Sequence, residues 1–167
     1  MFKHAFKRYL GNYLYYCMIK YIAALLFLVL SSFTIAEKDW GHNFKDAIST
    51  AKRDHKFILL NFSGSDWCGP CIKLHKEVFV MDDFMNVANN KLVLLNADFP
   101  RYKKNQLPAA QQKINDELAE KYNSKGFFPL TVLLDEDGNE IKHWEGFPAS
   151  TTAFINDIQQ TIQDHSK

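Results

Sequence analysis

The chain has 167 residues, of which 47% are hydrophobic and 23% are charged. This balance is typical of one globular domain with a sizeable core, and it excludes a disordered or fibrous protein. The formal net charge is +1, and a chain of this length needs no disulfide scaffold to fold.

The first 36 residues are expected to be an export leader. They contain no acidic residue, carry four basic ones, and end in the uncharged run YIAALLFLVLSSFTIA, which is 16 residues long. That run is shorter than the roughly 20 residues that span a bilayer as a helix, and small residues close it, as in a signal peptide. We predict cleavage after Ala36 and export, with the periplasm as the expected compartment. Two alternatives stay open: a retained leader that anchors an exported domain in the membrane, and a translation start at Met18.

Removal of the leader changes both the charge and the cysteine count. The basic residues lost are Lys3, Lys7, Arg8 and Lys20, so 16 basic residues face 19 acidic ones and the formal net charge becomes −3. Nucleic acid is therefore not an expected partner, because phosphate binding requires a basic face. Cys17 is lost as well, and the domain of residues 37–167 keeps only Cys68 and Cys71.

The first half of this domain alternates helical and buried-strand patterns. Apolar residues at helical spacing predict a helix over residues 43–54, with Asn43 as its N-cap. The continuous apolar run of residues 56–64 indicates a buried strand. Further helices are expected over residues 69–79, with Pro70 in the first turn, and over 81–90, before a second buried strand over 91–98.

The second half starts with a loop between two prolines, FPRYKKNQLP, residues 99–108. A helix is predicted over residues 109–123 and two strands within 126–146, which a turn at Asp137-Gly138 connects. A last helix over residues 150–165 starts at a Ser150 cap and carries an apolar stripe. The order α-β-α-α-β-α-β-β-α predicts an α/β domain with a mixed sheet between helices.

The two remaining cysteines stand three positions apart in SDWCGPCIKLHKEVF, residues 65–79. A structural zinc site usually has four protein ligands, and neither a second cysteine pair nor a suitably spaced histidine pair is present. A disulfide that closes so short a loop also removes little entropy from the unfolded chain. These residues therefore favour redox chemistry over a metal site or a structural bridge.

The stretch ILLNFSGSDWCGPC resembles the strand and active-site turn of the thioredoxin superfamily. KLVLLNAD, KYNSKGFFPLTVLLDEDGNEI and a closing helix follow in the order of that family. The resemblance covers residues 37–167 and is closest to exported thioredoxin-like proteins and to the thiol-carrying domains of membrane-linked disulfide reductases. It implies a thioredoxin fold and a protein-disulfide oxidoreductase active in cell redox homeostasis.

The cysteine spacing also has a physical reason that does not depend on the family. A helix N-terminus offers unpaired N–H groups and a partial positive charge, which favour the thiolate of Cys68. Cys71 lies on the same helical face, within bridging distance. Cys68 is therefore the expected nucleophile and Cys71 the resolving thiol. Neither a cofactor nor a metal is expected, since the cysteines carry the electrons.

Five further residues are expected to bind substrate. Gly69 and Pro70 shape the turn, and Trp67 flanks the attacking sulfur, with an ordinary core tryptophan as the alternative. The resemblance implies that Pro129 is a cis-proline opposite the cysteines and that the neighbouring backbone pairs with substrate. Phe128, which precedes it, would make this platform more apolar.

The sequence departs from the family near the second cysteine. Asn61 occupies the place of a buried aspartate that aids proton transfer, and asparagine cannot accept a proton. Asp66 and Glu77 are alternatives for that role, although a helix cap and a solvated helix position are the simpler interpretations. His75 could share the helical face of the cysteines, yet a lone histidine is more often structural. The loop of residues 99–108 is either solvated surface or a partner contact.

The expected partners are protein thiols and disulfides, with a membrane-linked electron donor, and the protein is expected to be a monomer. The Gly-Pro pair between the cysteines resembles that of reducing thioredoxins and favours a reductant. A disulfide oxidase or isomerase is the alternative within the same class. A module that binds or delivers Cu(I) through the two thiolates is a rival from another class.

Overall fold

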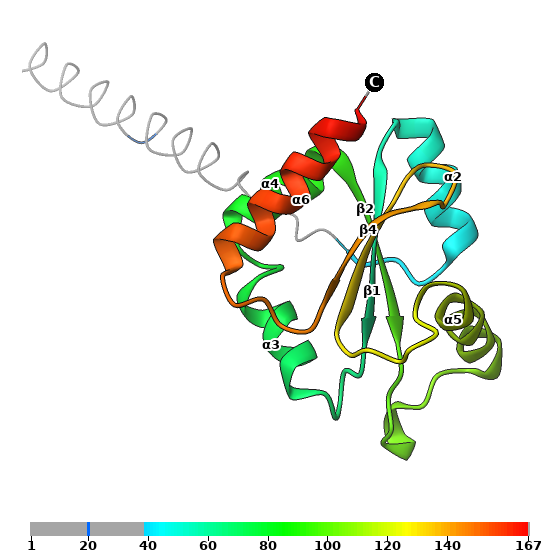
Figure 1. Cartoon of the computed structure of the whole chain (residues 1–167). Coiled ribbons are helices and arrows are strands. Elements are labelled where there is room, and N and C mark those ends of the chain that lie inside the picture. The colour runs from blue at the N-terminus through cyan, green and yellow to red at the C-terminus, as the bar shows by residue number, and fades with distance from the viewer. Residues whose placement is uncertain (1–19, 21–38, 167) are drawn as a thin grey trace, which may run out of the picture. The chain divides into compact units, whose positions relative to one another are not determined.

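The computed structural model describes Lys20 and residues 39–166. Apart from Lys20, the expected leader, with Cys17, Met18 and the predicted cleavage point at Ala36, lies outside the described residues. The elements below belong to the unit of residues 38–167 and carry the labels of Figure 1.

The predicted order of elements is confirmed. In chain order the elements are α2 (Phe44–Asp54), β1 (Phe57–Ser63), α3 (Gly69–Glu77), α4 (Asp82–Lys91), β2 (Leu92–Asp98), the 3-10 turn η1 (Lys103–Asn105), α5 (Ala109–Tyr122), β3 (Leu130–Leu134), β4 (Glu140–Glu145) and α6 (Thr151–His165). The helix starts follow the sequence signals. Asn43 accepts the N–H of Lys45 at 3.0 Å, and Ser150 accepts that of Ala153 at 3.3 Å.

The four strands form one mixed sheet in the order β2-β1-β3-β4. β1 pairs with β2 in parallel and with β3 antiparallel, while β3 and β4 form a hairpin. The register places Ser63 beside Asp98 and Phe62 beside Leu130. The end of β1, the end of β2 and the start of β3 therefore meet at one edge of the sheet.

Helices cover both faces of this sheet (Figure 1). The helices α3, α4 and α6 lie on one face, and α2 and α5 lie on the other. Side chains of β1 alternate between the two cores, since Leu59 packs with α3, α4 and α6, whereas Leu60 and Phe62 pack with α2 and α5. The expected α/β thioredoxin fold is thus the fold observed.

The turn between β3 and β4 is longer than two residues. The Asp135 carboxylate accepts the backbone N–H groups of Asp137 and Asn139 at 2.9 and 2.8 Å. Gly138 has a φ of +82°, which only glycine adopts freely, and an added Cβ would contact Phe44 and Ile48. Among residues 39–166, no helix has both the length and the apolar character needed to cross a membrane.

Candidate active site

Cys68 and Cys71 form a disulfide at the start of α3, with a Cα–Cα distance of 5.2 Å. Cys68 is the N-cap of this helix, and its Sγ accepts the backbone N–H of Cys71 at 3.3 Å. Pro70 occupies the first turn, where its missing N–H leaves no hydrogen bond unmade. The helix N-terminus therefore directs an N–H group at the sulfur that was predicted to attack.

Both cysteines are buried in the disulfide form. In this oxidised form Cys68 is 4% exposed and Cys71 is 1% exposed, so neither is freely accessible. The turn between them is open, since Gly69 and Pro70 are exposed and a Cβ added at Gly69 would meet nothing within 4 Å. A partner can therefore approach the disulfide from the side of this turn.

The Phe128-Pro129 peptide bond is cis, as the resemblance implied. It lies just before β3, which starts where β1 ends, so this segment and the cysteine turn share one edge of the sheet. The Trp67 and Phe128 rings are in edge-to-face contact, with centroids 5.4 Å apart. Trp67 and Phe128, both expected at a substrate platform, are thus brought together.

Trp67 is held from two further directions by the loop after β2. Its Nε1 donates to the backbone oxygen of Phe99 at 2.7 Å. The guanidinium of Arg101 lies 3.6 Å from the centroid of the indole ring. The Phe99 ring also contacts Phe128, with centroids 5.5 Å apart. Trp67 is therefore half-buried in a cluster with Phe99, Arg101 and Phe128, directly before Cys68. Its part in binding substrate stays a prediction.

Asp66 does not cap the helix, as the simpler interpretation expected, because Cys68 occupies that position. The Asp66 carboxylate instead accepts the backbone N–H groups of Arg101 and Tyr102, both at 2.9 Å, and Nδ2 of Asn105 at 3.0 Å. Burial acts to raise the pKa of Asp66, but these hydrogen bonds outweigh it and the pKa lies below its usual value. Asp66 is thus a loop anchor and a poor proton acceptor.

Glu77 has the simpler of its two expected roles. It is exposed near the end of α3 and lies 3.7 Å from the ammonium of Lys73 one turn earlier. Such an exposed pair contributes little to stability. Glu77 therefore belongs to the solvated helix surface.

Asn61 and the half-buried His75 form a polar pair between β1 and α3. Asn61 is fully buried in β1, and its Oδ1 lies 3.2 Å from Nε2 of His75 on α3. Its Nδ2 donates to the oxygen of Leu130 at 3.3 Å and to Oγ1 of Thr131 at 3.1 Å. Burial lowers the pKa of His75, and the charge of Asp98 only partly opposes this shift. His75 is therefore kept neutral at physiological pH.

A pocket of about 210 Å³ is lined by both His75 and Cys71. Its lining residues are Ser63, Ser65, Cys71, Ile72, His75, Lys76 and Asn96. The pocket has room for a water molecule, and His75, Ser63, Ser65 and Asn96 supply polar groups in its lining. The histidine that the sequence left as structural thus lines the same pocket as Cys71.

Sequence reasoning missed the part that Asp98 plays at this edge of the sheet. Its carboxylate accepts the N–H and hydroxyl of Ser65 at 2.8 and 2.5 Å and the hydroxyl of Ser63 at 3.1 Å. Its backbone oxygen accepts Nδ2 of Asn115 at 2.7 Å. The signal was present, because an aspartate and two serines follow or end two neighbouring parallel strands. Asp98 therefore fixes the chain that leads from β1 into the cysteine turn.

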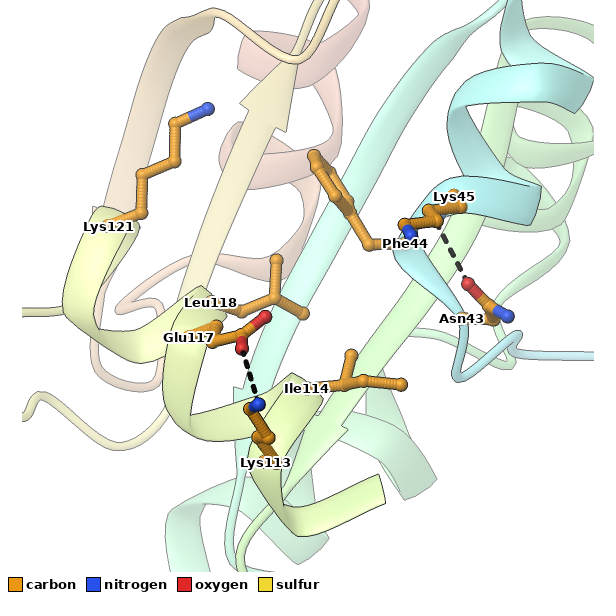
Figure 2. A pocket seen from close by; sticks show the side chains of 8 residues that line it. All are labelled: Asn43, Phe44, Lys45, Lys113, Ile114, Glu117, Leu118 and Lys121. Atoms are coloured by element: carbon orange, nitrogen blue, oxygen red, sulfur yellow. Dashed lines mark hydrogen bonds and ion pairs between the residues drawn. The ribbon is translucent and has the colours of Figure 1, made fainter. Parts of the chain in front are cut away.

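A larger groove of about 540 Å³ lies between α2 and α5 (Figure 2). Phe44, Ile114 and Leu118 line it together with Asn43, Lys45, Lys113, Glu117 and Lys121. It contains neither cysteine, and its one ion pair joins Lys113 to Glu117 at 3.9 Å. Across residues 39–166, no group of three or more His, Cys, Asp or Glu side chains could hold a metal ion.

Comparison with known proteins agrees with this geometry. A family model described as a thioredoxin-like domain matches residues 44–160. The disulfide bond reductase DsbH of Chlamydia pneumoniae is 31% identical over 128 residues, which are 77% of this chain and 75% of the relative. The thioredoxin-related protein DsbJ of the same organism is 27% identical over 118 residues, 71% of this chain but 33% of that relative.

A solved structure described as DsbH oxidoreductase is similar in both fold and sequence. It aligns with a TM-score of 0.66 at 32% identity and covers 75% of this chain and 84% of its own. The chain is therefore similar, over most of its described residues, to proteins named for disulfide chemistry.

Proposed function

Given that this chain belongs to the thioredoxin-like family and is a protein-disulfide oxidoreductase, we propose that it reduces disulfides of exported proteins through Cys68 and Cys71. The observation that carries the proposal is the position of Cys68. Its sulfur accepts an N–H group at the N-terminus of α3 and bonds to a cysteine buried behind it. Such a position favours the thiolate, which is the attacking species.

The reaction transfers two electrons from the reduced pair to the substrate. The Cys68 thiolate attacks one sulfur of a substrate disulfide, and the other substrate sulfur leaves as a thiolate. Cys71 then loses its proton and attacks Cys68 Sγ, which releases the second substrate sulfur. The products are the Cys68–Cys71 disulfide and a reduced substrate. A membrane-linked donor would then reduce the pair again.

The substrate would lie across the turn and the cis-proline segment. Gly69 and Pro70 leave the cysteines approachable, and Trp67 with Phe128 offers an apolar surface beside them. The backbone at Pro129 would pair with the substrate chain. These roles apply to an extended peptide around the substrate cysteine, and they fit the monomer that the sequence favours.

The reducing direction is supported by the Gly-Pro pair and by the relative named a disulfide bond reductase. Export is supported by the basic and apolar composition of residues 1–36. N-terminal sequencing of protein from the envelope fraction should find Glu37 as the first residue. Recovery of the hydrophobic run in a membrane-bound species would instead indicate an anchored enzyme.

Trapping of intermediates tests the assigned roles. Cys71→Ser keeps the attacking thiolate and removes the group that resolves the intermediate, so mixed disulfides should accumulate. Cys68→Ser should trap far less, because Cys71 is 1% exposed behind it. Non-reducing gels and mass spectrometry would show and identify the trapped partners. Equal trapping by both variants would overturn the roles, and no trapping by either would argue against disulfide exchange.

A further inference from the structure

The position of Arg101 is fixed by the active-site turn itself. Its guanidinium lies 3.6 Å from the centroid of the Trp67 ring, and its backbone N–H donates to Asp66 at 2.9 Å. Asp66 also binds the N–H of Tyr102 and the side chain of Asn105. Because Asp66 and Trp67 directly precede Cys68, the segment that presents the attacking sulfur also presents this cation. We call Asp66, Trp67, Arg101 and Asn105 the Arg101 seat.

The charge of Arg101 is available to a partner. Arg101 is exposed, and within residues 39–166 it forms no ion pair with a carboxylate. The Asp66 carboxylate forms no ion pair with the guanidinium of Arg101 and accepts backbone and amide N–H groups instead. An arginine stacked on an aromatic ring keeps its N–H groups free at the edge of the guanidinium plane. The seat therefore presents unused donors and a positive charge over the ring of Trp67, the residue before Cys68.

The surroundings of the seat indicate the kind of partner. Phe128 and Phe99 contact each other, and Phe128 contacts Trp67, while Tyr102 is 55% exposed and Phe127 is 37% exposed. Lys103 and Lys104 follow in the same loop and are exposed. A complementary segment would carry a carboxylate near its cysteine and apolar side chains on either side.

We propose that the Arg101 seat makes this protein select substrate disulfides whose cysteine is flanked by acidic residues. This inference rests on the proposed function and specifies its substrate class. Arg101 would bind the substrate carboxylate while Trp67 and Phe128 cover the apolar part of the same segment. The sequence left the loop of residues 99–108 as a possible partner contact, but it did not place Arg101 against Trp67, which is 34 positions earlier.

Three matched peptide disulfides test the proposal. They share one sequence except that the residues beside each cysteine are glutamate, glutamine or lysine. The rate constant for their reduction by the reduced protein is followed by tryptophan fluorescence. The acidic peptide should react fastest and the basic one slowest. The ratio of the acidic peptide's rate constant to that of the basic peptide should fall toward one as salt rises to about 1 M.

Substitutions at Arg101 and at Lys104 distinguish the effect of the Arg101 charge from that of other positive charges in the same loop. Arg101→Gln should slow the acidic peptide about two- to five-fold, as expected for one exposed ion pair. Arg101→Lys keeps the positive charge but cannot stack as a plane on Trp67. It should therefore prefer the acidic peptide more than Arg101→Gln does and less than the wild-type protein does. Lys104→Gln removes the same charge from the same loop outside the seat and should keep most of the preference.

The outcomes distinguish the seat from the function on which it rests. If the wild-type protein reduced all three peptides at the same rate, the proposed selection of acidic substrates by the Arg101 seat would be wrong and the proposed disulfide reductase function would still hold. Reduction of none would overturn both. An equal loss of preference in Arg101→Gln and Lys104→Gln would show that loop charge alone selects, and would also overturn the seat.

Discussion

Nε2 of His75 lies 3.2 Å from Oδ1 of Asn61, in the space between α3 and the sheet. Asn61 directs its Nδ2 at Leu130 and Thr131, so its oxygen faces the imidazole and Nε2 must be the donor. The ring also contacts Trp40 and Phe79, each with a centroid distance of 5.1 Å. A neutral histidine thus occupies the region where the family resemblance led us to look for a carboxylate.

We expect His75 to make the oxidised protein less stable in mild acid. Burial lowers its pKa below 6.5 in the folded state, so below pH 6.5 the unfolded chain binds more protons than the folded one. The stability contribution is complete above pH 6.5 and is lost as the pH falls toward the lowered pKa. Urea unfolding at several pH values should therefore show a smaller loss on acidification for His75→Gln than for the wild-type protein.

The oxidised form is the right one for this comparison, because its cysteines do not titrate. The other histidines and the carboxylates, Asp98 included, are common to both proteins, so the difference between the two slopes reports His75. Parallel stability curves from pH 5 to pH 7.5 would contradict the assignment.

Asn61→Asp should speed release of the mixed disulfide near neutral pH, because it would place a carboxylate beside His75, which lines the same pocket as Cys71, and a carboxylate can accept the proton of that thiol. It should also cost about 1–3 kcal/mol of folding free energy, since the donor to Leu130 and Thr131 is lost. Single-turnover kinetics from the trapped intermediate measure the first effect and urea unfolding the second. Unchanged release would mean that another group, or solvent, already takes the proton.

Gly64→Ala should displace Trp67 and slow reduction of protein disulfides. A Cβ at this position would overlap Cε2, Nε1 and Cζ2 of the Trp67 indole, which is held by Phe99 and Arg101. Overpacking of this kind usually costs about 1–3 kcal/mol. Near-ultraviolet circular dichroism should report the moved indole. Gly41→Ala is a matched control, because its nearest contact would be an ordinary 3.5 Å from the oxygen of Leu94.

The reduction potential of the Cys68–Cys71 pair should indicate a reductant. Equilibration with glutathione, with the two forms separated by their tryptophan fluorescence, gives this value. We expect it near the reference of about −270 mV for thioredoxin, and a value near about −120 mV would make the protein an oxidant instead.

Much of the fold could be predicted from the sequence, because its signals are local. Continuous apolar runs predicted β1 and β2, and Asn43 and Ser150 marked the starts of α2 and α6. The two cysteines were assigned to redox chemistry because the sequence lacks the further ligands of a structural zinc site and because so short a loop gains little from a structural bridge. The cis bond before Pro129 came from the resemblance alone, since a proline in this context gives no local sign of its isomer.

The tertiary structure decided what surrounds the cysteines. The partners of Asp66 lie 35 to 39 positions away, and His75 meets Asn61 across 14 positions. These contacts exist only because parallel pairing brings the ends of β1 and β2 to one edge, while α3 packs across the sheet behind them. Helical and strand periodicity fix which face a side chain occupies, but they carry no information on what lies opposite. The sequence therefore determined which two cysteines stand together at a helix start, and packing determined the groups that would govern their proton transfer and their choice of partner.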